Sequence, residues 1–238
     1  MIIIPAIDLI DGQVVRLLQG DYSKQKSYAL SPLAAAEAFA AQGAEYLHVV
    51  DLDGARSGKP ENSSVISELC GKTGLRIEVG GGIRSEEQVV RYLEAGVARV
   101  ILGTVVVKDP GFTENMIRKY GSRIVAGIDA RDGWVAVNGW ETTSEVSALD
   151  LCQRVAELGV STVIYTDISR DGAMRGVNLP AYASLRELKG LSIIASGGVT
   201  GLDDIRNLKE IGVDGAIIGK ALYENRIQLK EAIQAARG

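Results

Sequence analysis

The sequence reads Ala-Ile-Asp-Leu-Ile-Asp-Gly at residues 6–12 and Gly-Ile-Asp-Ala-Arg-Asp-Gly at residues 127–133, an offset of 121 positions. Each copy is an apolar run that ends in an aspartate, followed by an Asp-Gly pair of the kind that favours a tight hairpin. From Ser31 onward the offset is 116, and at this offset Gly81-Gly82 matches Gly197-Gly198. Matching landmarks at a nearly constant offset indicate a duplication of two similar halves.

Short β-branched runs alternate with amphipathic stretches along the whole chain, without a linker between them. Eight such units in 238 residues suit an α/β chain that closes into a (β/α)8 TIM barrel. We therefore predict one domain over residues 1–238, built from two half-barrels at about 1–120 and 121–238. The expected strands are 2–7, 46–51, 76–79, 99–102, 124–128, 162–167, 191–195 and 215–218, and the expected helices are 32–42, 64–71, 86–95, 112–120, 147–158, 179–188, 202–211 and 227–236.

Composition excludes several classes of protein. The formal net charge of −4 lacks the basic excess that nucleic-acid or membrane-surface binders need. Cys70 and Cys152 are isolated, which is typical of free thiols in a reducing compartment. No apolar run is long enough to span a membrane, and Asp8 and Asp11 precede the first basic residue, Arg16, unlike the start of a signal peptide. These features predict a cytoplasmic protein.

Two aspartates are the candidate catalytic residues. Reactive groups of a (β/α)8 barrel lie at the carboxyl ends of its strands. Asp8 and Asp129 end the first and fifth predicted strands, so we expect them to face each other across the barrel mouth. Two carboxylates in different environments can act as a base and an acid. The alternative is that each aspartate caps its own hairpin.

Glycine-rich strand ends form a second candidate site. Glycine lets backbone N–H groups approach an anion, and the loops after strands 7 and 8 are the usual phosphate site of a barrel. The duplication predicts a second phosphate site after strands 3 and 4, and therefore a small-molecule bisphosphate substrate. The alternative is that the glycines only form turns. The candidate phosphate-binding residues are Gly81, Gly82, Gly103 and Thr104 in the first half, and Gly197, Gly198, Gly219 and Lys220 in the second.

Three further features allow weaker interpretations. His48, the sole histidine, lies within a predicted strand and is either a core residue or a neighbour of the substrate. Residues 21–28 hold the five extra positions of the first half, and we expect a polar, structureless loop that acts as a lid, the alternative being a tolerated insertion. No metal-ligand cluster, Walker-type loop or dinucleotide-binding motif is present, so we predict no metal and no cofactor.

The motifs together resemble the family of histidine-biosynthesis isomerases that act on phosphoribosylformimino-5-aminoimidazole carboxamide ribotide (ProFAR). The matching stretches are 4–12, 15–22, 48–55, 79–85, 139–141, 166–172 and 196–198, and the likeness covers essentially the whole chain.

The resemblance implies a cofactor-free Amadori rearrangement, in which Asp8 is the base and Asp129 the acid. It implies that Thr166 holds the reacting sugar and that Asp171 and Gly172 lie beside a phosphate. Arg16 and His48 are the remaining substrate-binding candidates, and a monomer is expected.

Three other functions remain open. The cyclase subunit of imidazole-glycerol-phosphate synthase shares the half-barrel repeat, but its Cys-Leu-Asp signature and its lysine at the position of Arg16 are missing here. A dual-specificity isomerase that also acts on phosphoribosylanthranilate shares Gly139-Trp140. A non-catalytic sugar-phosphate binding subunit is disfavoured, because two nearby carboxylates would repel a dianionic ligand.

Overall fold

The barrel is closed. The computed structural model describes all residues from Met1 to Gly238. Eight parallel strands follow each other around the sheet, and pairing of the fifth with the sixth along the chain completes the ring. This confirms the predicted (β/α)8 architecture. The barrel strands are β1 (Ile2–Ile10), β4 (Tyr46–Asp51), β5 (Arg76–Gly80), β6 (Arg99–Leu102), β7 (Ile124–Arg131), β10 (Thr162–Asp167), β11 (Ser192–Ser196) and β12 (Gly215–Ile218).

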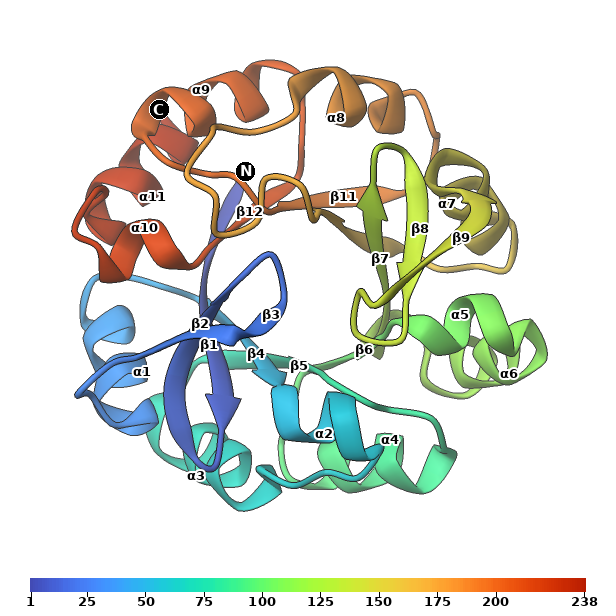
Figure 1. Cartoon of the computed structure of the whole chain (residues 1–238), viewed down its shortest axis with the longest axis horizontal. Coiled ribbons are helices and arrows are strands. Elements are labelled where there is room, and N and C mark those ends of the chain that lie inside the picture. Colours follow the sequence, from blue (N-terminus) through green and yellow to red (C-terminus); the bar gives the residue numbers. More distant parts are fainter.

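Helices form an outer ring around these strands (Figure 1). The eight main helices are α1 (Pro32–Ala41), α3 (Ser63–Thr73), α4 (Glu86–Glu94), α6 (Pro110–Tyr120), α7 (Ala148–Glu157), α8 (Leu179–Arg186), α9 (Leu202–Glu210) and α11 (Leu229–Arg237). Their predicted ranges are confirmed to within a few residues. Four shorter helical segments were not predicted, because one or two turns carry no readable periodicity: α2 (Leu52–Ser57), α5 (Thr104–Lys108), the 3-10 turn η1 (Gly121–Arg123) and α10 (Lys220–Tyr223). None of the helices has the length and apolar character needed to cross a membrane.

Both Asp-Gly pairs form the predicted hairpins. Asp11 and Gly12 have φ angles of 50° and 70°, and Asp132 and Gly133 have 53° and 84°. These left-handed conformations match the turn that joins two twisted antiparallel strands. The first pair connects β1 to β2 (Gln13–Leu18), and the second connects β7 to β8 (Trp134–Val137). The duplication is therefore visible in local geometry as well as in sequence.

The prediction of a structureless loop at residues 21–28 is wrong. Residues Asp21–Ser27 form strand β3, which pairs antiparallel with β2, and Thr142–Ser147 form the corresponding β9 in the second half. The Lys26 Nζ also lies 2.6 Å from a carboxylate oxygen of Glu224. Because Glu224 directly follows α10, this ion pair attaches β3 to the segment after the last barrel strand. Most of β3 is exposed, so its sequence lacks the apolar alternation by which strands are recognised.

Apolar side chains fill the barrel below its mouth. Residues Ile4, Ala6, Ile101, Val125, Ile164, Ile194 and Ile217 form a small core inside the strands, separate from the larger core between strands and helices. Because this inner core closes the lower part of the barrel, the open space lies at the carboxyl ends of the strands.

A buried carboxylate ends β4 and its repeat equivalent ends β10. Asp51 is fully buried and accepts hydrogen bonds from the Asn62 side chain at 2.7 Å and the Asn62 backbone N–H at 3.0 Å. At the offset of 116, Asp167 accepts a hydrogen bond from the Asn178 side chain at 2.7 Å. Asn62 is buried, whereas Asn178 is partly exposed. The same contact between an asparagine and an aspartate thus occurs in both halves, but the asparagine of the first half is better shielded from water.

This inequality predicts unequal losses of stability. Asn62→Ala should lower the free energy of unfolding by about 2–3 kcal/mol, because it leaves a buried carboxylate short of donors. Asn178→Ala should cost about 1 kcal/mol, because water can replace the lost donor. Urea unfolding of both variants, compared at equal slope, measures the difference. Equal losses would contradict the importance of shielding at Asp51.

Candidate active site

A cavity of about 480 Å³ opens at the carboxyl ends of the strands, and a smaller pocket of about 30 Å³ lies beside it. The larger one is of the size that holds small ligands. All fifteen site residues predicted from the sequence line one or both. The cavity is lined by Asp8, Arg16, His48, Gly81, Gly82, Gly103, Thr104, Asp129, Thr166 and Asp171, and the pocket by Arg16, Asp171, Gly172, Gly197, Gly198, Gly219 and Lys220.

The strand order puts Asp8 opposite Asp129. Asp8 lies on β1 and Asp129 on β7, and these strands are four places apart in a closed ring of eight. The glycine-rich ends of β5 and β6 lie on one arc between them, and those of β11 and β12 lie on the other. The two predicted phosphate rims therefore face each other across the line that joins the aspartates.

Asp8 is paired with a cation. The Arg16 Nη1 lies 2.9 Å from its Oδ2, and both side chains are nearly buried. The hairpin creates this contact, since Asp8 on β1 is in register with Val15 on β2. Burial raises the pKa of Asp8, while the Arg16 guanidinium opposes that rise. The ion pair thus favours the charged carboxylate, which is the form that can accept a proton.

Asp129 has no cation of this kind. Its Oδ2 accepts a hydrogen bond of 2.7 Å from the indole Nε1 of Trp140. Burial raises the pKa of Asp129, and hydrogen bonds from Trp140 and Thr166 only partly offset this. The sequence motif at 139–141 contained Trp140, but its role as a donor to Asp129 was missed, because nothing in the motif states where the indole points.

Asp171 is a third carboxyl group in the same space. It follows β10 and lines both the cavity and the pocket. Burial raises its pKa to about 6, the charge of Arg16 opposes this, and the neighbouring Asp8 and Asp129 add to it. The sequence assigned it to substrate binding alone, yet among these groups it has an environment that retains a proton close to neutral pH.

The paired glycines are required by backbone packing. Gly82 and Gly198 have φ angles of 70° and 96°. A Cβ at Gly82 would lie 1.8 Å from the Gly54 carbonyl oxygen, and one at Gly198 would lie 2.6 Å from that of Gly176. Larger residues therefore cannot be placed there without moving a loop. Substitution of these glycines would consequently disturb packing as well as any anion contact.

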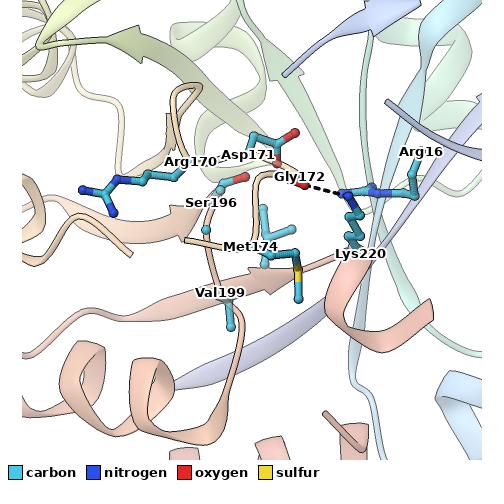
Figure 2. A pocket seen from close by; sticks show the side chains of 12 residues that line it. Arg16, Arg170, Asp171, Gly172, Met174, Ser196, Val199 and Lys220 are labelled. Carbon is cyan, nitrogen blue, oxygen red and sulfur yellow. Dashed lines mark hydrogen bonds between the residues drawn. The ribbon is translucent and has the colours of Figure 1, made fainter. Parts of the chain in front are cut away.

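Cations line both rims. The pocket holds Arg16, Arg170 and Lys220, and the Lys220 Nζ donates to the Gly172 carbonyl oxygen at 2.8 Å (Figure 2). Across the cavity, Arg84 and Lys108 line the wall near the first glycine pair. Arg84, Lys108 and Arg170 were missed from the sequence, because isolated basic residues in loops have no distinguishing pattern.

The two halves differ in how their cations are placed. The Arg16 guanidinium lies against Gly219, where a Cβ would be 1.9 Å from Nη2, whereas the equivalent Gly103 has open space at this position. The arrangement can hold one anion at each rim and place two or three carboxyl groups between them. No group of three or more His, Cys, Asp or Glu side chains is arranged to hold a metal ion.

Comparisons with known proteins identify the family of the chain. The family model described as "Histidine biosynthesis protein" matches residues 2–228. A relative from Geobacillus thermodenitrificans is 53% identical over 98% of this chain and 96% of its own. One from Listeria monocytogenes is 50% identical over 98% of both chains, and one from Acetivibrio thermocellus is 48% identical over 100% of both.

These three relatives share the name 1-(5-phosphoribosyl)-5-((5-phosphoribosylamino)methylideneamino)imidazole-4-carboxamide isomerase. The family match spans nearly the whole chain, and the similarity runs from end to end. The chain belongs to the histidine biosynthesis protein family.

Proposed function

We propose that the chain is the isomerase that converts ProFAR, the compound of its relatives' names, into the corresponding aminoketose by an Amadori rearrangement. The observation that carries this proposal is the pair of opposed, nearly buried carboxyl groups between two cationic, glycine-rich rims. The compound carries a phosphoribosyl group at each end, as its name states, so each rim has one phosphate to bind. Turnover of the purified chain with ProFAR is the direct test.

The reaction needs one acid and one base. In our assignment the protonated Asp129 donates to the ribose ring oxygen, which opens the ring and forms an imine. The ionised Asp8 then removes the proton from C2, and the resulting enol becomes the ketone. Protons move within the site and no net oxidation occurs. Arg16 supports this assignment because it favours the charged form of Asp8, whereas Asp129 lacks such a partner.

Binding of both phosphates supplies the orientation. The substrate is long and has many rotatable bonds, so the reacting ribose must be fixed between the carboxyl groups. Anchors at the two rims do this before proton transfer begins. In this proposal Thr166, which lies beside Asp129 on the neighbouring strand and lines the cavity, contacts the opened sugar.

Asp171 is a second candidate for the acid. Its pKa of about 6 means that a useful fraction is protonated near neutral pH. It lies in the same cavity as Asp129. The two assignments make different predictions for amide variants, which are given below.

The other functions are tested with other substrates. Phosphoribosylanthranilate turnover would indicate a dual-specificity isomerase, and cyclisation of the ketose product would indicate the cyclase. Binding without turnover would indicate a sugar-phosphate binding subunit. A monomeric state and a cytoplasmic location also remain predictions, which gel filtration and cell fractionation address.

The roles of the aspartates can be separated by isotope exchange. Exchange of carbon-bound protons of the ketose product with heavy water requires enolisation but no ring opening. Asp8→Asn should abolish both exchange and turnover, because the base is lost. Asp129→Asn should lower kcat by roughly a hundredfold or more and keep part of the exchange. Proton NMR of the product with each variant measures this.

The same experiment includes Asp171→Asn. Turnover that survives in Asp129→Asn but disappears in Asp171→Asn would transfer the acid role to Asp171. Exchange that survives in Asp8→Asn but disappears in Asp129→Asn would reverse our assignment of base and acid.

A second prediction concerns stability and pH. Because the folded pKa of Asp171 is about 6 and its ordinary value is 3.8, the native state binds more protons between these values. The contribution of this group to stability is therefore present below about pH 4 and is lost as the pH rises through 6. Asp171→Asn should be more stable than the wild type at pH 7 by up to about 3 kcal/mol. Urea unfolding from pH 4 to 7 tests this, and a constant difference would contradict it.

A third prediction concerns the phosphate rims. Lys220→Gln removes a cation beside the pocket and should raise KM for ProFAR roughly tenfold or more, because a charge-assisted contact to phosphate is lost. Lys119→Gln, which removes an exposed cation on α6 far from the cavity, is the matched control and should leave KM unchanged. An unchanged KM in Lys220→Gln would remove Lys220 from the proposed phosphate site.

A further inference from the structure

Three inward-facing positions in the first half of the barrel hold polar side chains where the second half holds apolar residues. His48, Glu78 and Arg99 point inward from β4, β5 and β6, and the equivalent positions at the offset of 116 hold isoleucine, isoleucine and glycine. Two of those equivalents, Ile164 and Ile194, belong to the inner apolar core. Because the second half fills the same layer without charges, closure of the barrel does not require the polar set.

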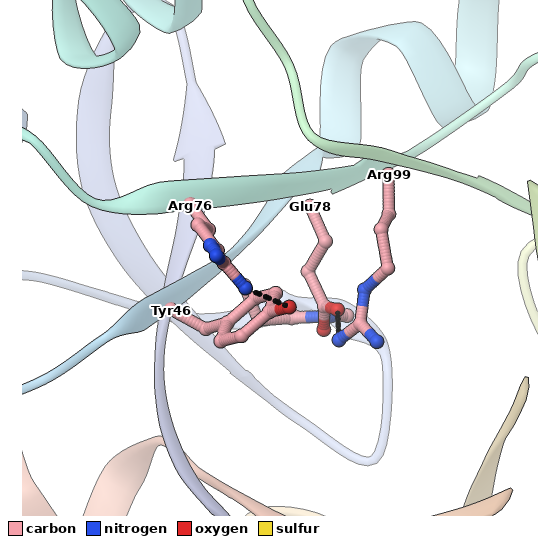
Figure 3. A network of polar contacts seen from close by, with 5 residues as sticks. Tyr46, Arg76, Glu78 and Arg99 are labelled. Carbon is pink, nitrogen blue, oxygen red and sulfur yellow. Dashed lines mark hydrogen bonds and ion pairs between the residues drawn. The ribbon is translucent and has the colours of Figure 1, made fainter. Parts of the chain in front are cut away.

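The polar set has a defined geometry. Glu78 is fully buried, one of its oxygens accepts from His48 Nδ1 at 2.8 Å, and the other contacts Arg99 Nη2. The Arg99 guanidinium in turn lies over the Tyr46 ring, 4.6 Å from its centre. Figure 3 shows Glu78 and Arg99 side by side, with Arg76 hydrogen-bonded to the Tyr46 hydroxyl. Both oxygens of the carboxylate therefore have a fixed partner.

These contacts determine where the imidazole proton lies. An ionised carboxylate only accepts, so His48 Nδ1 must carry a proton. Burial by itself would raise the pKa of Glu78, but the hydrogen bonds and charges of His48 and Arg99 outweigh it and lower the pKa, which keeps the group ionised. The ring lines the cavity, and Nε2 is the nitrogen that remains for a ligand.

We propose that Glu78 is a positioning residue that holds His48 as the Nδ1-protonated tautomer, so that Nε2 accepts a hydrogen bond from a sugar hydroxyl of the substrate. The substrate contact rests on the proposed function, whereas the tautomer does not. Glu78 itself lies beside the histidine, in register with it on the neighbouring strand, and acts through it.

Replacement of Glu78 by glutamine makes a sharp test. Glutamine has one accepting oxygen and one donating NH2 group. Arg99 only donates, so the glutamine oxygen must face Arg99 and the NH2 must face His48. Nδ1 can then accept only without its proton, and the proton moves to Nε2. Glu78→Gln should therefore reverse the tautomer with little change in shape.

The histidine can be observed without assignment, because the chain contains only one. Nitrogen-15 NMR of imidazole-labelled, tag-free protein at about pH 8 reports which nitrogen carries the proton, since this is above the ordinary pKa of histidine. We expect Nδ1–H in the wild type and Nε2–H in Glu78→Gln. The variant should also lose roughly tenfold to a hundredfold in kcat/KM for ProFAR.

Two further variants complete the test. Glu78→Gln combined with Arg99→Leu frees the glutamine oxygen to turn to His48, and it should restore Nδ1–H together with part of kcat/KM. Glu86→Gln makes the same chemical change at an exposed ion pair on α4, and it should alter neither the tautomer nor the kinetics.

Three results would overturn the proposal: Nε2–H in the wild type, a tautomer that Glu78→Gln leaves unchanged, or a reversed tautomer with unaltered kcat/KM. The wild-type spectrum decides the first of these even if the variants fail to fold. Absence of ProFAR turnover in the wild type would instead contradict the proposed function, and the nitrogen spectra, which need no substrate, would still decide the tautomer.

Discussion

Closure of the parallel sheet by the pairing of β7 with β10 is the constraint on which the rest of the structure depends. In a closed parallel ring all carboxyl ends lie on one rim, so residues more than a hundred positions apart in the chain are brought around one space. Asp8 and Asp129 face each other because their strands are four places apart in this ring. The same closure puts the glycine-rich strand ends on the two remaining arcs. An open sheet with the same strands would separate these groups.

The duplication supplied a symmetric frame, and the side chains that fill it differ between the halves. Both halves retain the hairpin, the buried aspartate with its asparagine, and the glycine pair, since these serve the backbone. The differences lie where a ligand would be contacted. Arg16 covers one rim but has no equivalent over Gly103. The inward positions of Glu78 and Arg99 are charged in the first half, and their equivalents in the second half are apolar.

The buried carboxyl groups of this site lower the folding stability of the chain. Three carboxyl groups share a nearly buried space. Burial raises the pKa of each, and the charges of Asp8 and Asp129 raise the pKa of Asp171 further. The Arg16 charge opposes this rise at Asp8 and at Asp171, whereas hydrogen bonds from Trp140 and Thr166 oppose it at Asp129. The guanidinium that pairs with Asp8 comes from β2, the adjacent strand of the same hairpin. Holding three carboxyl groups in so nearly buried a space therefore costs folding stability.

The sequence by itself determined the elements and their repetition. Buried strands such as β4, β6, β10 and β12 were predicted to the residue, because covered parallel strands are continuous apolar runs. The position of the strand-end aspartates and glycines around the cavity was predicted as well, because the functional groups of a (β/α)8 barrel lie at the carboxyl ends of its strands. Two kinds of element were not predictable from the sequence. Strand β3 is exposed and polar, so it lacks an apolar pattern, and the helices α2, α5 and α10 are too short to show a periodicity. Only the tertiary structure decided which groups touch. The Trp140 indole on Asp129, the Arg16 guanidinium on Asp8 and the Glu78 carboxylate on His48 each join different strands or loops. Such contacts depend on side-chain direction after closure, which no local pattern encodes.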